Sequence, residues 1–123
     1  MTAAPLLLEQ SADGVATVTL NRPEMHNALD EILIREITRS FDMLGSDPAC
    51  RMVLLKANGA SFCAGADINW MQRTANSSKE DNIAEAQNLA LMMKTLYEFP
   101  KPLIGLVQGT AVGGGVGIVA CCD

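Results

Sequence analysis

The sequence has little positive charge. Nine Lys and Arg stand against 14 Asp and Glu, which gives a net charge of −5 at pH 7. Proteins that bind nucleic acid or an anionic membrane need clustered Lys and Arg to neutralise phosphates, and no basic run occurs along this chain. We therefore expect neither nucleic acid nor a membrane surface as a partner.

Long apolar segments are also missing. No stretch approaches the roughly 18 to 20 apolar residues of a membrane-spanning helix, and residues 1–10 lack the positively charged start of a secretory signal. The four cysteines have no metal-ligand spacing, and the adjacent pair Cys121 and Cys122 does not suit a disulfide framework. These features predict a cytoplasmic protein with reduced, buried thiols and no bound metal.

Several catalytic motifs are incomplete. A dinucleotide fingerprint that starts at Gly113 needs a third glycine where Ile118 stands, and a phosphate-binding loop needs Lys and Ser or Thr where Gly115 and Val116 stand. The single histidine, His26, has no orienting carboxylate beside it, which disfavours a Ser-His-Asp or Cys-His arrangement. We expect a structural or solvent-exposed role for His26. Cys63, without a base, is expected to be a packing residue.

Hydrophobic residues make up 49% of the 123 residues, which is enough for one folded domain. The pattern predicts a hairpin of strands 6–10 and 15–20 that turns at Asp13-Gly14. A helix over residues 29–44 follows, capped by Asn27 or Asp30 and ended by Gly45. The apolar run of residues 52–55 is typical of a parallel strand buried on both faces.

The second half of the chain continues with a short helix near residues 69–72 and a polar, mobile break at 74–81. A long amphipathic helix is then expected before Pro100, with an apolar face made of Ile83, Ala86, Leu89, Ala90, Met93, Leu96 and Tyr97. An apolar stretch at 103–107 and another at 118–122 complete the order. Alternating strands and helices indicate an α/β layer fold.

The most informative segment is the glycine run Val112-Gly113-Gly114-Gly115-Val116-Gly117 at the predicted start of the last helix. Three adjacent glycines remove every Cβ, so a ligand can approach the backbone closely, and the first turn of a helix adds partial positive charge. This pattern favours an anion-binding loop. The alternative is a tight strand-to-helix turn that needs glycine only for its dihedral angles.

A second loop of small residues, 61–68, also follows a predicted strand and precedes a short helix. An enolate or tetrahedral oxyanion formed from a thioester is stabilised well by two preorganised N–H groups from separate loops. The two loops together therefore suggest a pair of donors that acts on one carbonyl oxygen.

Three segments together resemble the enoyl-CoA hydratase/isomerase (crotonase) family, and the resemblance runs from about residue 6 to the end. They are Leu20-Asn21-Arg22-Pro23-Glu24-Met25-His26-Asn27-Ala28-Leu29, Phe62-Cys63-Ala64-Gly65-Ala66-Asp67-Ile68, and Gln108-Gly109-Thr110-Ala111-Val112-Gly113-Gly114-Gly115. The resemblance implies a crotonase-like superhelix of repeated ββα units. Family members are about twice this long, and the sequence stops directly after an apolar stretch. We therefore expect residues 1–123 to be the N-terminal part of a single domain.

The resemblance also implies the roles of individual residues. The oxyanion-hole amides would be those of Ala66 and Gly114. Main-chain atoms of Ala64, Ala66, Asp67 and Ile68 would hold the adenine of coenzyme A, and the segment around Met25 would flank the thioester arm. Coenzyme A would enter only as part of the substrate, with no other cofactor, and the assembly would be a homotrimer or a dimer of trimers.

The reaction stays open between alternatives. Hydratases of the family use two glutamates, one of which would stand where this chain has Gly117, and the other would lie beyond Asp123. We expect an enoyl-CoA hydratase first, with an enoyl-CoA isomerase or a non-catalytic acyl-CoA-binding subunit as alternatives. The segment Asp67-Ile68-Asn69-Trp70-Met71 is similar to the methylglutaconyl-CoA hydratase-like branch of the family.

Overall fold

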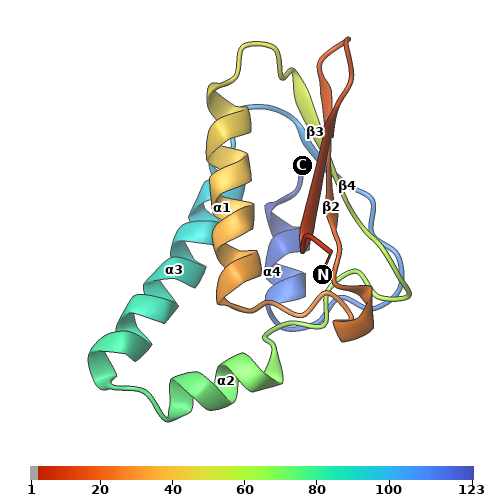
Figure 1. The fold of residues 1–123 in the computed structure, drawn as a ribbon. Coiled ribbons are helices and arrows are strands. Elements are labelled where there is room, and N and C mark those ends of the chain that lie inside the picture. The colour runs from red at the N-terminus through yellow and green to blue at the C-terminus, as the bar shows by residue number, and fades with distance from the viewer. Residues whose placement is uncertain (1–2) are drawn as a thin grey trace.

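Four strands form one sheet in the order β1-β2-β3-β4, and the α-helices lie to one side of it (Figure 1). The computed structural model describes residues 3–123. The elements in chain order are β1 (Leu6–Gln10), β2 (Val15–Leu20), the 3-10 helix η1 (Pro23–Met25), α1 (Glu31–Ser46), β3 (Met52–Ala57), α2 (Ile68–Ala75), α3 (Lys79–Tyr97), β4 (Leu103–Gly105) and α4 (Gly114–Cys121).

The first two strands form the predicted antiparallel hairpin, with Leu6 opposite Leu20. Its turn depends on Gly14, whose φ of +93° lies in the left-handed region that other residues rarely adopt. The next two pairings, β2 with β3 and β3 with β4, are parallel. The α/β class and the bounds of the hairpin strands are therefore confirmed.

The expectation that β3 is buried on both faces is wrong for this chain. Val53 and Leu55 are fully buried, Leu54 is half-buried and Lys56 is exposed. The alternation arises because the helices cover only one face of the sheet. That covered face meets the apolar sides of the helices in the main core, which includes Ala16, Val18, Leu20, Leu33, Ile34, Ile37, Phe41, Leu44, Val53, Leu55, Met92, Leu96, Leu103 and Ile118.

Helix α1 confirms one of its two predicted caps but ends later than predicted. Asp30 is the N-cap, and its carboxylate accepts a hydrogen bond from the Leu33 N–H at 2.9 Å. Asn27, the other cap candidate, lies three residues earlier, outside the helix. Gly45 does not end the helix either, because it lies within the last turn and the C-cap is Asp47.

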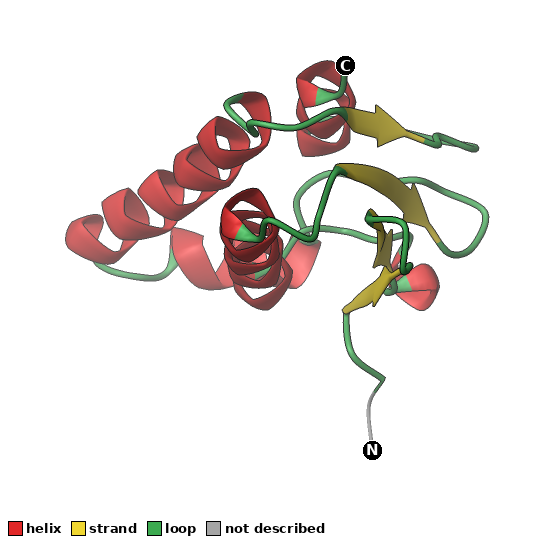
Figure 2. Cartoon of the chain, turned by 90° about the horizontal axis from the view of Figure 1, so that it is seen from above, coloured by secondary structure: helices red, strands yellow, loops and turns green. Residues whose placement is uncertain are grey.

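Helix α3 has the predicted position but not the predicted buried face. Of the apolar residues assigned to that face, Leu96 is buried and Leu89 and Met93 pack at the core's edge, whereas Ile83 and Tyr97 are exposed. The cause is visible in Figure 2, where the N-terminal part of α3 extends away from the sheet. Within the described residues, no helix is both long and apolar enough to cross a membrane.

The order of a strand, a residue that takes part in an isolated bridge, and a helix occurs three times along the chain. After β2 comes Leu29, after β3 come Cys63 and Ala66, and after β4 comes Ala111. Isolated parallel bridges join Leu29 to Ala66 and Cys63 to Ala111. Helices α1, α2 and α4 follow these bridges in turn. The repetition places equivalent loops of consecutive units beside one another.

Candidate active site

The loops after β3 and β4 are joined by backbone hydrogen bonds. The Cys63 N–H donates to the Thr110 carbonyl at 3.1 Å, and the Val112 N–H donates to the Cys63 carbonyl at 3.1 Å. These are the two bonds of the parallel bridge between Cys63 and Ala111. The loops that the sequence analysis selected are therefore fixed against each other through their backbones.

Close approach of the two loops requires glycine. A Cβ at Gly109 would lie 1.9 Å from the Ala60 carbonyl oxygen, and a Cβ at Gly115 would lie 2.4 Å from the Cys63 carbonyl oxygen. Either distance is far below a van der Waals contact. The alternative reading of the glycine run, dihedral freedom alone, is incomplete because Gly115 is needed for space.

Leu29 holds the loop on both sides of Ala66. Its N–H donates to the Gly65 carbonyl at 2.7 Å, and its carbonyl accepts from the Asp67 N–H at 2.8 Å. The Ala66 N–H itself has no acceptor among residues 3–123, and neither does the Gly114 N–H. Both proposed donors are thus available to a ligand.

The two free N–H groups occupy equivalent positions of successive units. Ala66 is three residues after Cys63, and Gly114 is three residues after Ala111, the bridge partner of Cys63. A Cβ built on Gly65 would lie 3.6 Å from the Gly114 nitrogen, so the residue preceding one donor contacts the other. This geometry brings Ala66 and Gly114 into one small region of the molecule.

The field of a helix adds to the Gly114 position. Gly114 is the first residue of α4, and Gly113 precedes it with a φ of +54°. The unpaired N–H groups of a first turn carry partial positive charge, which favours a negative oxygen beside them. The site therefore combines free donors with a favourable local potential.

Two other predicted contact residues use their N–H groups internally. The Ala64 N–H donates to the His26 carbonyl at 3.0 Å, and the Asp67 N–H donates to the Leu29 carbonyl. The carbonyl oxygens of Ala64 and Ala66 accept no hydrogen bond from the described residues. Ala64 therefore offers a ligand its carbonyl oxygen but not its N–H, and Ala66 offers both groups.

Met25 and Ile68 both present apolar side chains to solvent. Met25 ends the 3-10 helix η1, and Ile68 is the first residue of α2, 70% exposed. The hydrogen bond between Ala64 and His26 brings the segment that follows Met25 against the 61–68 loop. Residues from two distant parts of the sequence thus border the same loop.

The Arg22 guanidinium is committed to internal partners. It lies 3.2 Å from the Asp67 carboxylate and 3.4 Å from the Asp30 carboxylate, and it also donates to the Ala28 carbonyl. In the sequence, Arg22 is the only basic residue of the motif around Met25, which makes it a weak candidate for a phosphate ligand. The structure gives it a different role, since it joins the segment before α1 to the loop before α2.

Asp67 is a buried carboxylate that caps α2. Burial acts to raise the pKa of Asp67, but hydrogen bonds from the Trp70 N–H and from Arg22 outweigh it and leave the pKa below its ordinary value. The side chain is therefore an ionised structural group. Its partners are all within the protein, which leaves it poorly suited to accept a proton from substrate.

Position 117 faces α3. A Cβ at Gly117 would lie 2.8 Å from the Met93 methyl carbon and 3.2 Å from its sulfur. The position that carries a glutamate in the family's hydratases is therefore lined by a thioether here.

Cys63 is fully buried, and burial raises the pKa of its thiol, which agrees with the expected packing role.

Two residues at the site were not selected from the sequence. Leu29 flanks Ala66 by hydrogen bonds, and its side chain would touch a Cβ at Gly114 at 2.9 Å. Asn27 is fully buried and bonded to three backbone groups. Leu29 was not selected because an apolar residue just before a helix is expected to pack in the core. Asn27 was selected only as a possible helix cap.

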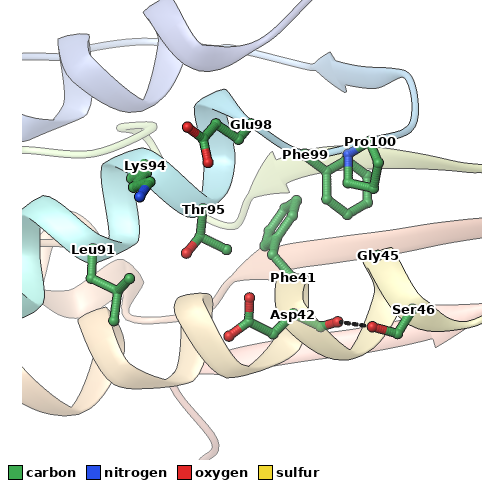
Figure 3. Close-up of a pocket in the computed structure, with 10 residues that line it drawn as sticks. All are labelled: Phe41, Asp42, Gly45, Ser46, Leu91, Lys94, Thr95, Glu98, Phe99 and Pro100. Atoms are coloured by element: carbon green, nitrogen blue, oxygen red, sulfur yellow. Dashed lines mark hydrogen bonds between the residues drawn. The ribbon is translucent and has the colours of Figure 1, made fainter.

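A pocket of about 330 Å³ lies elsewhere, between α1 and α3 (Figure 3). Phe41 and Phe99 meet there edge to face, with ring centroids 5.2 Å apart, and the pocket is also lined by Lys94 of α3 and by Glu98, the C-cap of α3. The pocket contains none of the residues of the two loops. It is a groove between packed helices and is separate from the candidate donors.

Comparison with known proteins shows the family of this chain. The enoyl-CoA hydratase/isomerase family model matches residues 10–123, and the chain belongs to that family. A putative enoyl-CoA hydratase of Thermus thermophilus is 36% identical over 89% of this chain and 43% of its own length. The human mitochondrial delta(3,5)-delta(2,4)-dienoyl-CoA isomerase is 33% identical over 89% of this chain and 36% of its own length.

Solved structures give the fold. An enoyl-CoA hydratase from Shewanella pealeana superposes with a TM-score of 0.93 at 43% identity, over 98% of this chain and 45% of that one. A putative enoyl-CoA hydratase/isomerase (crotonase) from Legionella pneumophila gives 0.92 at 42% identity, over 99% of this chain and 47% of that one. The fold is crotonase-like, and the chain spans less than half the length of these relatives.

Proposed function

We propose that these residues form the N-terminal part of an acyl-CoA enzyme whose Ala66 and Gly114 N–H groups bind the carbonyl oxygen of a thioester. The observation that carries the proposal is the pair of free N–H groups at equivalent positions of two hydrogen-bonded loops. Each such donor is worth about 3 kcal/mol of barrier when negative charge develops on the oxygen.

The proposed reaction is the addition of water to a 2-enoyl-CoA. A base removes a proton from water, the oxygen attacks the β-carbon, and the electron pair of the double bond moves to the thioester oxygen as an enolate. The enolate then takes a proton at the α-carbon. Ala66 and Gly114 stabilise the enolate, and the acid and base are not supplied by position 117.

The adenine of coenzyme A is proposed to lie against the 61–68 loop. Its exocyclic amine is a donor, and the carbonyl oxygens of Ala64 and Ala66 in this loop accept no hydrogen bond from the described residues. Asp67 shapes the loop through Arg22, while the exposed side chains of Met25 and Ile68 offer apolar contact to the pantetheine arm. No other cofactor is invoked, and a cytoplasmic location and a homotrimer or dimer of trimers stay predictions.

Gly117 supports a second candidate, an enoyl-CoA isomerase. In the shift of a double bond from the 3- to the 2-position, a base takes a proton from the α-carbon, and the resulting dienolate takes a proton at the γ-carbon. The dienolate places negative charge on the same thioester oxygen, and one base can carry both transfers. Offering 2-enoyl and 3-enoyl thioesters separately, and identifying the products by chromatography, distinguishes the reactions. Calorimetric binding of coenzyme A with neither product would instead favour the non-catalytic binding subunit.

The substitution Gly114→Pro tests the donor role in the full-length protein, meaning a chain of the relatives' length that carries these residues. Proline is tolerated in the first turn of a helix but has no N–H. We expect kcat for a 2-enoyl-CoA to fall by roughly 10²- to 10³-fold, as measured by loss of the enoyl thioester absorbance.

The matched control is Gly114→Ala. Its Cβ meets the end of the flexible Leu29 side chain at 2.9 Å, as the proline Cβ does, but the N–H is retained. Alanine should keep most of the activity. Equal losses in both variants would show that the space at Gly114, and not its N–H, matters for turnover.

A further inference from the structure

The backbone at His26 and Asn27 is unusual. These are the only non-glycine residues with positive φ in the described part of the chain, at 52° and 56°. Two consecutive residues in the left-handed region are strained, and such strain persists only where the surroundings hold it. The contacts of Asn27 supply that restraint.

The Asn27 carboxamide makes three hydrogen bonds from a fully buried position. Its oxygen accepts from the Arg22 N–H at 2.7 Å, and its nitrogen donates to the Asn58 and Ser61 carbonyls, each at 2.9 Å. The orientation of the amide is unambiguous, since an N–H faces the oxygen and two carbonyls face the nitrogen. The side chain thus ties the segment after β2 to the beginning of the 61–68 loop.

The residues that flank Asn27 hold the rest of that loop. The His26 carbonyl accepts from the Ala64 N–H, and Leu29 bonds on both sides of Ala66. The loop from Ser61 to Asp67 is therefore fixed at its start by the Asn27 side chain and farther along by the backbone on each side of Asn27. A displacement of Asn27 would move Ala66.

We propose that Asn27 is a positioning residue that fixes the direction of the Ala66 N–H toward the substrate oxygen. The proposal rests on the function proposed above. A donor that is misplaced by a fraction of a hydrogen-bond length loses most of its effect on the transition state and little of its effect on binding. Loss of the carboxamide should therefore lower kcat more than it raises KM.

Two variants of the full-length protein test the proposal. Asn27→Asp retains the acceptor and tolerates the left-handed backbone, but it turns an oxygen toward the Asn58 and Ser61 carbonyls. Asn27→Gly relieves the strain and deletes the amide, which keeps the test available if the aspartate variant does not fold. In each, kcat should fall by about 10- to 100-fold with KM changed less than about threefold.

The matched control is Asn21→Asp. Asn21 lies nearby in the same segment, but its amide nitrogen donates to the Ala4 carbonyl, away from the 61–68 loop. Its oxygen, which accepts from Asn58, is kept by aspartate. Near-normal kcat is expected. A loss in this variant equal to that in Asn27→Asp would overturn the positioning role.

A spectroscopic measurement separates this proposal from the proposed reaction. Butanoyl-CoA has no double bond to hydrate, and its thioester carbonyl stretch reports polarisation by N–H donors. In the unsubstituted protein the bound stretch should move to lower wavenumber, and the Asn27 variants should lose about half of that shift because one of two donors is misplaced.

Each outcome has a definite meaning. A wild-type shift without turnover of either enoyl thioester would reject the proposed reaction and leave the positioning role supported by the reduced shift in the variants. An unchanged shift and unchanged kcat in both Asn27 variants would overturn the positioning role alone. Absence of a shift in the wild-type protein would overturn both.

Discussion

At the scale of single residues, the ion pair of Arg22 with Asp67 links three segments. The guanidinium contacts Asp30, Asp67 and the Ala28 carbonyl, and both partner carboxylates are largely buried. Substitution Arg22→Met keeps the apolar stem and removes the charge. We expect the free energy of unfolding of the full-length protein to fall by about 2 to 3 kcal/mol, as measured by urea denaturation.

Asp67 adds a pH dependence to this stability. Its pKa in the folded state lies below the ordinary value of 3.8, so its stabilising contribution is complete above that value and is lost as the pH falls through the lower folded-state pKa. Asn at this position retains the helix cap. We expect wild type to lose more stability than Asp67→Asn between pH 5 and the acid limit of folding, by urea denaturation at each pH. Parallel curves would contradict this.

Two residues have roles in the structure that could not be predicted from the sequence, for the same physical reason. Asn27 is a good cap by type, and its spacing from the helix allowed that role, but tertiary contacts with Asn58 and Ser61 decided its conformation. Arg22 is the only cation in its motif, and only the fold shows that Asp67, distant in sequence, neutralises it. Long-range partners of this kind leave no periodic signal.

At the scale of elements, α4 packs through its glycines in two different ways. Gly115 faces the Cys63 carbonyl, which is rigid backbone, whereas Gly117 faces the end of the flexible Met93 side chain. Gly115→Ala should destabilise the full-length protein by about 1 to 3 kcal/mol and reduce turnover by displacing Gly114. Thermal unfolding and kcat measure the two effects.

The matched variant Gly117→Ala adds the same methyl group on the same helix. Met93 can move aside, and alanine favours a helix over glycine by up to about 1 kcal/mol. We therefore expect stability within about 1 kcal/mol of wild type and nearly normal kcat. Comparable damage from both substitutions would show that Met93 is held rigidly.

Local pattern predicted most of the elements. Asp13-Gly14 predicted the hairpin, and helical spacing predicted α1 and α3, with Pro100 after the end of α3. A short apolar run predicted β3, and the glycine run predicted the start of α4. The exposure of individual apolar residues on these elements did not follow from the sequence pattern. Ile83 and Tyr97 have the spacing of a buried face but lie where no described element covers them, and Leu54 belongs to a sheet face without helices. Periodicity predicts which face of an element is apolar, but it does not predict whether another element packs against that face.

At the scale of the whole molecule, one segment exposes much apolar surface. Leu106, Val107 and Val112 lie between β4 and α4, Val116 lies in the first turn of α4, and each is 44% to 54% exposed. Apolar side chains gathered in this way favour association. We expect the 123-residue chain produced alone to self-associate and to bind a hydrophobic dye, by sedimentation velocity and fluorescence.

Two double variants test the origin of that association. Replacing Leu106 and Val116 with Gln should reduce both signals. Replacing Ile32 and Met43, which are similarly exposed on α1, with Gln should leave association and dye binding nearly unchanged. Isolated apolar residues of this kind are common on protein surfaces. A monomeric wild-type chain would contradict the expectation.

The repeated strand–bridge–helix unit has a consequence for the origin of the site. Leu29, Ala66 and Gly114 each stand nine positions beyond the last residue of a strand: Leu20, Ala57 and Gly105. The Leu29 N–H donates to the Gly65 carbonyl, whereas the N–H groups of Ala66 and Gly114 have no acceptor among the described residues. A tandem duplication of one ancestral unit would create a second free N–H group at the position equivalent to the first, so the pair of donors proposed above for the thioester oxygen requires no side chain.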